Sequence, residues 1–255
     1  MSFDISHVLN EWPYQPGEIQ VRRFKGKDGC EKIQLRVDVG LLQMNGQGRP
    51  DGKRPFGHES LLEHHQARLE RYLKTSGNDE SGFKLTAEDC ARLQQEAIQY
   101  YHRFICLFQL KDFSGVIRDT NRNLSVFSFA KKYAESDELA WMLLQFTPQL
   151  LMMQIRAKGA LALEDKKYGE AQDLIRAALE EIRDFYRQQS RQDLVENGSE
   201  INFLENWLQE IQAKRPLSEK EKLELALNEA VGREDYEKAA EVRDALRNLK
   251  QSSSN

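Results

Sequence analysis

From residue 58 to residue 250, apolar side chains follow the spacing of amphipathic helices, recurring at i, i+3, i+4 and i+7 in one run after another. The interruptions are short: a polar, glycine-containing segment at 75–82, Pro148 and the Arg215–Pro216 pair. Helices of this kind bury their apolar stripes by packing against other helices. We therefore expect a mainly α fold, with a helical body over 58–213 and a further helical segment over 217–250.

Three segments of this region share one pattern, in which charged or polar residues precede an aromatic residue and a small or β-branched residue follows three positions later. The aromatic residues are Phe113, Tyr168 and Tyr236. Each is expected to open the second helix of a hairpin, where the small residue lets the first helix approach closely. This is the arrangement of tetratricopeptide-type repeats. The aromatic residues are 55 and 68 positions apart, so the array would be degenerate, and ordinary helix-bundle packing is the alternative.

The segment 217–250 is predicted to form an antiparallel helical hairpin. Ser218 and Glu221 have the spacing of a capping box, and Gly232 is placed where a left-handed residue would end the first helix. The second helix is expected to begin near Asp235. Its predicted inward side comprises Tyr236, Ala239, Ala240, Val242, Leu246 and Leu249. A hairpin of this size is too small to sustain its own core, so we expect it to need a partner.

The same segment resembles the UVR motif, the helical hairpin at the C-terminus of the excision-repair subunit UvrB and within UvrC. The resemblance rests on Leu227, Asp235, Tyr236, Glu237, Lys238, Ala239, Ala240, Arg243, Asp244, Leu246 and Leu249. It implies protein–protein contact, because hairpins of that family dimerise or dock on a cognate hairpin. The interface residues that it implies are Leu227, Tyr236, Ala239, Ala240, Arg243, Asp244, Leu246 and Leu249.

The chain departs from its UVR-containing relatives in other respects. It has no helicase or nuclease motif such as UvrB and UvrC carry, and none of the CxxC pairs of McsA-type UVR adaptors. Its whole pattern looks most like that of a bacterial UVR-motif protein, from which no enzymatic activity follows.

The first 57 residues form the β-like part of the chain. Residues 1–17 are expected to be irregular, whereas Glu18–Lys25 and Lys32–Leu42 read as two strands. Gly26–Gly29 supplies the Asp-Gly turn of a tight hairpin between them. A two-stranded hairpin is marginal in water, so its apolar face should be covered by the rest of the chain or by a second copy.

A glycine-, proline- and arginine-rich loop over 46–57 follows the hairpin. Residues 17–57 carry nine Lys/Arg and five Asp/Glu, a net charge of +4 in a chain of net charge −4. The candidate anion- or nucleic-acid-binding residues are Arg22, Arg23, Lys25, Arg49, Lys53 and Arg54. The alternatives are an ordered connector and docking of this positive segment against an acidic helical body. No Walker-type phosphate loop is present.

Catalytic and metal-binding patterns are absent from the sequence: there is no GxSxG, HExxH or Gly-rich dinucleotide fingerprint. Glu59 and Glu63 lie one helical turn apart with His64 and His65 adjacent, but they lack the i, i+4 histidine pair and a completing cluster. We expect no cofactor, no metal and no enzymatic activity. Arg156 follows an apolar run and is expected to be partly buried beside a carboxylate.

The scattered Cys30, Cys90 and Cys106 fit reduced thiols, and neither an export leader nor an apolar run of about 18 residues is present. These features predict a cytoplasmic protein without a membrane segment. The expected domains are 1–57, 58–213 and 217–250, followed by a disordered tail over 251–255. The favoured function is a non-enzymatic adaptor that docks a partner protein, or a second copy, through the C-terminal hairpin. The alternative is a DNA-repair accessory that contacts nucleic acid through the basic segment and recruits excision-repair proteins.

Overall fold

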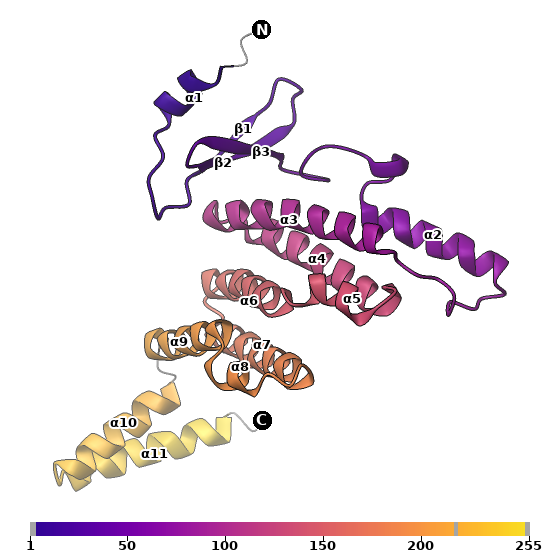
Figure 1. Ribbon diagram of the computed structural model, residues 1–255. Coiled ribbons are helices and arrows are strands. Elements are labelled where there is room, and N and C mark those ends of the chain that lie inside the picture. Colours follow the sequence, from indigo (N-terminus) through magenta and orange to yellow (C-terminus); the bar gives the residue numbers. More distant parts are fainter. Residues whose placement is uncertain (1–3, 217–218, 253–255) are drawn as a thin grey trace. The chain divides into compact units, whose positions relative to one another are not determined.

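The protein is mainly helical, with one small antiparallel sheet near its N-terminus (Figure 1). The structure is a computed structural model that describes residues 4–216 and 219–252. It divides into two compact units, one ending at Leu208 and the other beginning at Gln209. The expected mainly α fold class is confirmed, with helical hairpins in both units.

The first unit begins with a short helix and a three-stranded sheet. Their bounds are α1 Ser6–Glu11, β1 Val21–Lys25, β2 Glu31–Val37 and β3 Gly40–Asn45. The longer helices that follow are α2 Leu61–Thr75, α3 Ala87–Gln109, α4 Phe113–Tyr133, α5 Asp137–Leu144, α6 Thr147–Glu164 and α7 Tyr168–Gln188. A 3₁₀ turn, η1 Pro55–Gly57, precedes α2, while α8 Gln192–Asn197 and α9 Ser199–Lys214 follow α7. The second unit contains α10 Glu219–Gly232 and α11 Tyr236–Ser252.

The N-terminal region differs from the expected two-stranded hairpin. The second predicted strand is interrupted by a tight turn at Asp38–Val39, so the chain reverses and adds β3 as a third strand, in the order β1-β2-β3. Val39 therefore lies exposed in the turn and not on the inner face. The expectation of irregular structure over 1–17 is wrong for α1, while residues 1–3 lie outside the described part.

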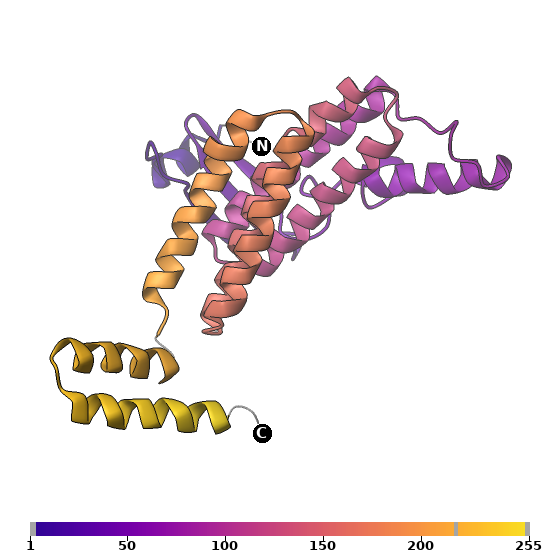
Figure 2. The same cartoon turned by 90° about the horizontal axis from the view of Figure 1, so that it is seen from below.

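The inner face of the sheet packs on the helices, as a marginal sheet requires. Ile33 of β2 and Met44 of β3 share a buried cluster with Phe104 and Leu107 of α3. The helices α3, α4, α6 and α7 pack in sequence as antiparallel neighbours. Consequently α3, α6 and α9 run in one direction and α4 and α7 in the other (Figures 1 and 2).

A buried ion pair between α3 and α4 fixes the loop that follows the sheet. Arg103 and Asp119 are both about 1 % exposed and form two hydrogen bonds, of 2.6 and 2.8 Å. The remaining Arg103 nitrogen donates to the carbonyl oxygens of Asn45 and Gly48, at 3.0 and 2.7 Å. The guanidinium therefore joins both helices to the loop, with its buried charge compensated.

Three helical hairpins share one turn geometry. Phe113, Tyr168 and Tyr236 are the first residues of α4, α7 and α11, as the sequence predicted. The residue two positions before each aromatic has a left-handed backbone: the φ angles of Lys111, Lys166 and Glu234 are 57°, 61° and 58°. The following residue donates a backbone hydrogen bond to the carbonyl five positions earlier in each turn. This is the 6→1 bond of a Schellman motif, which closes the first helix of each hairpin.

This common geometry corrects the role assigned to Gly232. The glycine remains within α10, and Glu234 takes the left-handed position. The predicted disordered tail is also wrong for residues 251 and 252, because α11 reaches Ser252. Ser218 of the predicted capping box and residues 253–255 lie outside the described part.

Replacing Lys166 with glycine should stabilise the protein, because a side chain in the left-handed region costs roughly 1–2 kcal/mol that glycine avoids. The entropy that glycine gains in the unfolded chain offsets part of this cost, so we expect the free energy of unfolding to rise by roughly 0.5–1 kcal/mol. Urea denaturation of Lys166→Gly measures the change. The matched control is Lys167→Gly, whose backbone φ of −86° gives glycine no advantage. Equal effects of the two substitutions would contradict a left-handed backbone at Lys166.

Candidate functional site

The C-terminal hairpin of α10 and α11 buries little of its apolar surface. Among its side chains that the structure describes, only Ala230 and Ala239 are buried. In contrast, Leu225, Val231 and Tyr236 are 52 %, 53 % and 71 % exposed. Two alanines provide a small core for two helices, so the larger apolar side chains remain available for contact with another surface.

Local polar contacts explain several residues of the motif. Asp235 is the N-cap of α11, and its carboxylate accepts a hydrogen bond from the backbone N–H of Lys238 at 3.1 Å. Asp112 caps α4 in the same way, accepting from the N–H of Gly115 at 2.9 Å. The Asp-aromatic pair that begins each of these helices is therefore a capping element joined to the turn described above.

The predicted interface residues fall into two groups. Ala239 is buried and Leu227 and Leu246 are half-buried, which places them against the other helix of the hairpin. Tyr236 and Ala240 are exposed, so their assignment to the inward side is wrong. Arg243 and Asp244 are exposed as well, and Leu249 lies outside the residues whose side chains the structure describes. The exposed residues remain predictions for contact with a partner.

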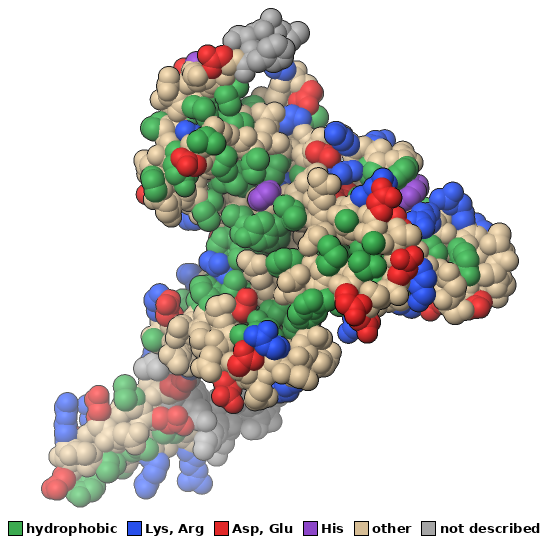
Figure 3. Space-filling view, in the orientation of Figure 1, with side chains coloured by type: hydrophobic (Ala, Val, Ile, Leu, Met, Phe, Trp, Pro, Cys, Tyr) green, Lys and Arg blue, Asp and Glu red, His purple; other side chains and the backbone are tan. Residues whose placement is uncertain are grey.

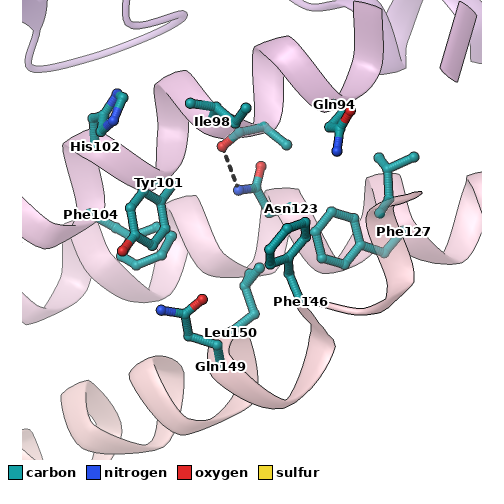
Figure 4. A pocket seen from close by; sticks show the side chains of 12 residues that line it. Gln94, Ile98, Tyr101, His102, Phe104, Asn123, Phe127, Phe146, Gln149 and Leu150 are labelled. Atoms are coloured by element: carbon teal, nitrogen blue, oxygen red, sulfur yellow. Dashed lines mark hydrogen bonds between the residues drawn. The ribbon is translucent and has the colours of Figure 1, made fainter. Parts of the chain in front are cut away.

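A second candidate surface was not predicted from the sequence: a cavity of about 280 Å³ between α3 and the start of α6. Side chains of the two helices point toward one another across it, and Asn123 of α4 donates to the Ala97 carbonyl at 3.0 Å (Figure 4). Its lining includes no Asp, Glu, Lys or Arg, so we refer to it as the neutral cavity. The residues that line it are Gln94, Ala97, Ile98, Tyr101, His102, Phe104, Asn123, Phe127, Leu143, Phe146, Gln149 and Leu150.

The neutral cavity opens to solvent between apolar side chains. Ile98 and Phe146 are 49 % and 43 % exposed, and hydrophobic side chains gather over the sheet and the adjoining parts of α3 and α6 (Figure 3). Burial lowers the pKa of His102, which favours the neutral imidazole. A sequence signal was available: residues 97–110 contain a single Lys, Arg, Asp or Glu, namely Arg103.

Most of the basic residues predicted to bind an anion or nucleic acid already have interaction partners within the chain. Arg23 forms ion pairs with Asp112 at 2.8 Å and Glu31 at 3.6 Å, and Arg49 forms them with Asp51 at 3.1 Å and Glu96 at 3.2 Å. These contacts support the docking of the positive segment against acidic residues of the helical body.

The other four basic residues have varied surroundings. Arg54 pairs with Glu59. Arg22 donates to the Gln34 side chain at 2.7 Å and lies over the Trp12 ring, 4.4 Å from its centroid. Lys25 and Lys53 are exposed, and neither side chain forms an ion pair with the residues that the structure describes.

Arg156 has aromatic partners where a carboxylate was expected. Its guanidinium carbon lies 4.4 Å from the centroid of the Phe108 ring in α3 and 4.6 Å from that of Phe203 in α9. Its one hydrogen bond within the described chain goes to the Met153 sulfur, at 3.4 Å. Burial lowers the pKa of Arg156, because half-buried surroundings disfavour its charge.

The histidines near η1 do not assemble a metal site. His58, His64 and His65 are neighbours, with ring centroids of successive pairs 5.4 and 5.1 Å apart. Over residues 4–216 and 219–252, no group of three or more His, Cys, Asp or Glu side chains converges as a metal site requires. The same part of the chain contains no helix with the length and apolar character needed to cross a membrane.

Comparison with known proteins identifies the C-terminal hairpin. Residues 218–252 match the family model described as the UvrB/uvrC motif, so the chain carries a UVR motif there, as the resemblance predicted. This motif indicates a role in protein interaction or in DNA repair. No curated protein matches the chain, and no solved structure matches it.

Proposed function

We propose that this protein is a non-enzymatic adaptor that docks a partner protein through the hairpin of α10 and α11. The observation that carries the proposal is the combination of the UVR motif with the exposure of Leu225, Val231 and Tyr236. Apolar side chains that are exposed in the free protein contribute about 1.5–3 kcal/mol each when an interface buries them fully. The occupant is a partner protein or a second copy of the hairpin.

Contact with nucleic acid is the less supported function. Four of the six basic residues predicted for it, including Arg23 and Arg49, already have charged, amide or aromatic partners within the chain. Lys25 and Lys53 alone provide too few phosphate contacts for the electrostatic binding that nucleic acids require.

The double variant Val231→Glu/Tyr236→Glu tests the docking function at the turn end of the hairpin. Both side chains are more than half exposed, so the hairpin should fold normally while the charges oppose burial in an interface. We expect self-association, measured by analytical ultracentrifugation, or capture of a partner from a native lysate to weaken at least tenfold.

Two further proteins make this test specific. Glu229→Gln changes an exposed position of α10 without adding charge and should leave association unchanged. A chain ending at residue 216 should behave as the double variant does. Recovery of the same partners, and the same sedimentation, for the full chain and the shortened chain would rule out the docking function.

A further inference from the structure

A second contact surface lies on the helical body, where α3, α6 and α9 meet around Arg156. The neutral cavity lies at one end of this surface and Arg156 at the other. Gln149, which lines the cavity, and Arg156 are seven residues apart in α6, which places them on the same side of the helix about 10 Å apart along its axis. Tyr101 and Phe108 have the same seven-residue spacing in α3.

Side chains of the two helices meet at both of these levels. Tyr101 and Gln149 line the cavity together, and Arg156 lies over the Phe108 ring two turns further on. Between these two levels, the side chains of both helices that belong to one buried cluster or pack against it are uncharged: Phe104, Ile105, Met152 and Met153. Arg103 of the same stretch is paired with Asp119 of α4. We call this surface, from the neutral cavity to Arg156, the α3/α6 surface.

Arg156 is the charged residue of the α3/α6 surface, and within the described part of the chain it has no anionic partner. No carboxylate of the described chain lies within 4.0 Å of it, whereas Arg103 of the same unit is paired with Asp119. Its ring contacts to Phe108 and Phe203 hold the guanidinium in place. The N–H donors of a guanidinium lie in its plane, so stacking leaves the donors other than the one on the Met153 sulfur free to bind a carboxylate with two parallel hydrogen bonds.

We propose that the α3/α6 surface binds an extended segment of a partner protein that places an apolar side chain in the neutral cavity and a carboxylate on Arg156. An extended chain advances about 3.3 Å per residue, so the carboxylate follows the apolar residue by about three positions. The charges of the α3/α6 surface favour this occupant: a cavity lined by uncharged residues suits an apolar side chain, and a single cation without an anionic partner in the described chain suits a single anion. This site is distinct from the hairpin and does not depend on the docking function proposed above.

A selection experiment tests the proposal with the full chain. A display library of random dodecapeptides is selected on the wild-type protein and, in parallel, on Arg156→Gln. We expect the wild type to enrich peptides in which Asp, Glu or the terminal carboxylate follows an apolar residue by about three positions. Enrichment of peptides without an acid, or the same enrichment on Arg156→Gln, overturns the proposal.

The affinities of one selected peptide for the wild type and for Arg156→Gln then show whether its acid contacts Arg156. Replacing its acid with the amide should weaken binding to the wild type roughly tenfold or more, as loss of a charge-assisted pair does, and should have little effect on Arg156→Gln. Equal losses on both proteins would contradict direct pairing. Displacement of the peptide by a single-stranded oligonucleotide at the same site would also overturn it, in favour of a nucleic acid.

Two variants separate binding from folding. Ile98→Glu places a charge at the half-exposed mouth of the neutral cavity and should weaken binding of both the acid and the amide peptide, with an unchanged thermal unfolding curve. Glu164→Gln changes an exposed position at the end of α6 and should bind as the wild type does. Wild-type affinity in Ile98→Glu would exclude the cavity from the site.

Discussion

Asp119→Asn should lower the free energy of unfolding by about 3 kcal/mol or more, because it leaves the Arg103 guanidinium buried without its anion. Asp119 accepts hydrogen bonds of 2.6 and 2.8 Å from Arg103 and one of 2.9 Å from Arg118. The substitution keeps the shape of the side chain, so the loss of stability measures the effect of removing the negative charge. Urea denaturation at pH 7 measures the change.

Glu88→Gln is the matched control for this prediction. It makes the same change of acid to amide in an exposed ion pair. The side chains of Glu88 and Arg92 are 72 % and 48 % exposed. Exposed pairs contribute roughly 0–1 kcal/mol, so the control should lie close to the wild type. The prediction is wrong if the two variants unfold with the same free energy.

Stability should fall as the pH is lowered from about 6.5 toward 4, because His65 cannot easily be protonated in the folded protein. The ring is 2 % exposed, and burial lowers its pKa from 6.5 to about 4, with Arg68 opposing and Asp89 favouring the charged form. Arg68 donates a hydrogen bond to Nδ1 at 2.9 Å, which also requires the neutral ring.

The direction of this pH effect follows from the protons that the folded and unfolded chains bind. Below pH 6.5 the unfolded chain binds a proton at His65 that the folded chain binds only near pH 4, so acid favours the unfolded state. A pKa difference of this size corresponds to about 3 kcal/mol at 1.36 kcal/mol per pH unit. This stability is fully present above pH 6.5 and is lost as the pH approaches 4.

His65→Gln should remove this part of the pH dependence. We expect urea denaturation at pH 7.0 and at pH 4.5 to give a smaller difference for the variant than for the wild type, by roughly 2 kcal/mol. His7→Gln, at an exposed position of α1, should retain the wild-type difference. A wild-type pH dependence in His65→Gln would assign the acid sensitivity to other groups.

The features that the sequence predicted best are those that depend on local patterns of residues. The aromatic starts of α4, α7 and α11 are correct because polar residues before the aromatic residue and an apolar stripe after it are both visible in a few neighbouring positions. The break at Asp38–Val39 was missed because the alternation of apolar residues continues through the turn, so the pattern of one strand resembles that of two.

Long-range pairing explains the remaining errors. The ion pair between Arg49 and Glu96 joins residues 47 positions apart, and no local pattern identifies Glu96 as its partner. Arg156 was expected beside a carboxylate, yet its partners are rings from two other helices. In the hairpin, adjacent Ala239 and Ala240 fit the same apolar pattern, and contact with a single neighbouring helix buries only the first.

Arg103 attaches the loop after the sheet to α3 and α4, and this attachment has a consequence for the order of folding. Its hydrogen bonds to Asn45 and Gly48 span 58 and 55 positions, and the Arg23–Asp112 pair spans 89, whereas each helical hairpin closes within a turn of a few residues. Closing a long loop costs entropy before its contacts form, so we expect the helical hairpins to form first and the sheet to dock last. Contacts formed after the rate-limiting step affect mainly the unfolding rate, and weakening the attachment of the sheet should therefore shorten the lifetime of the native state more than it slows refolding.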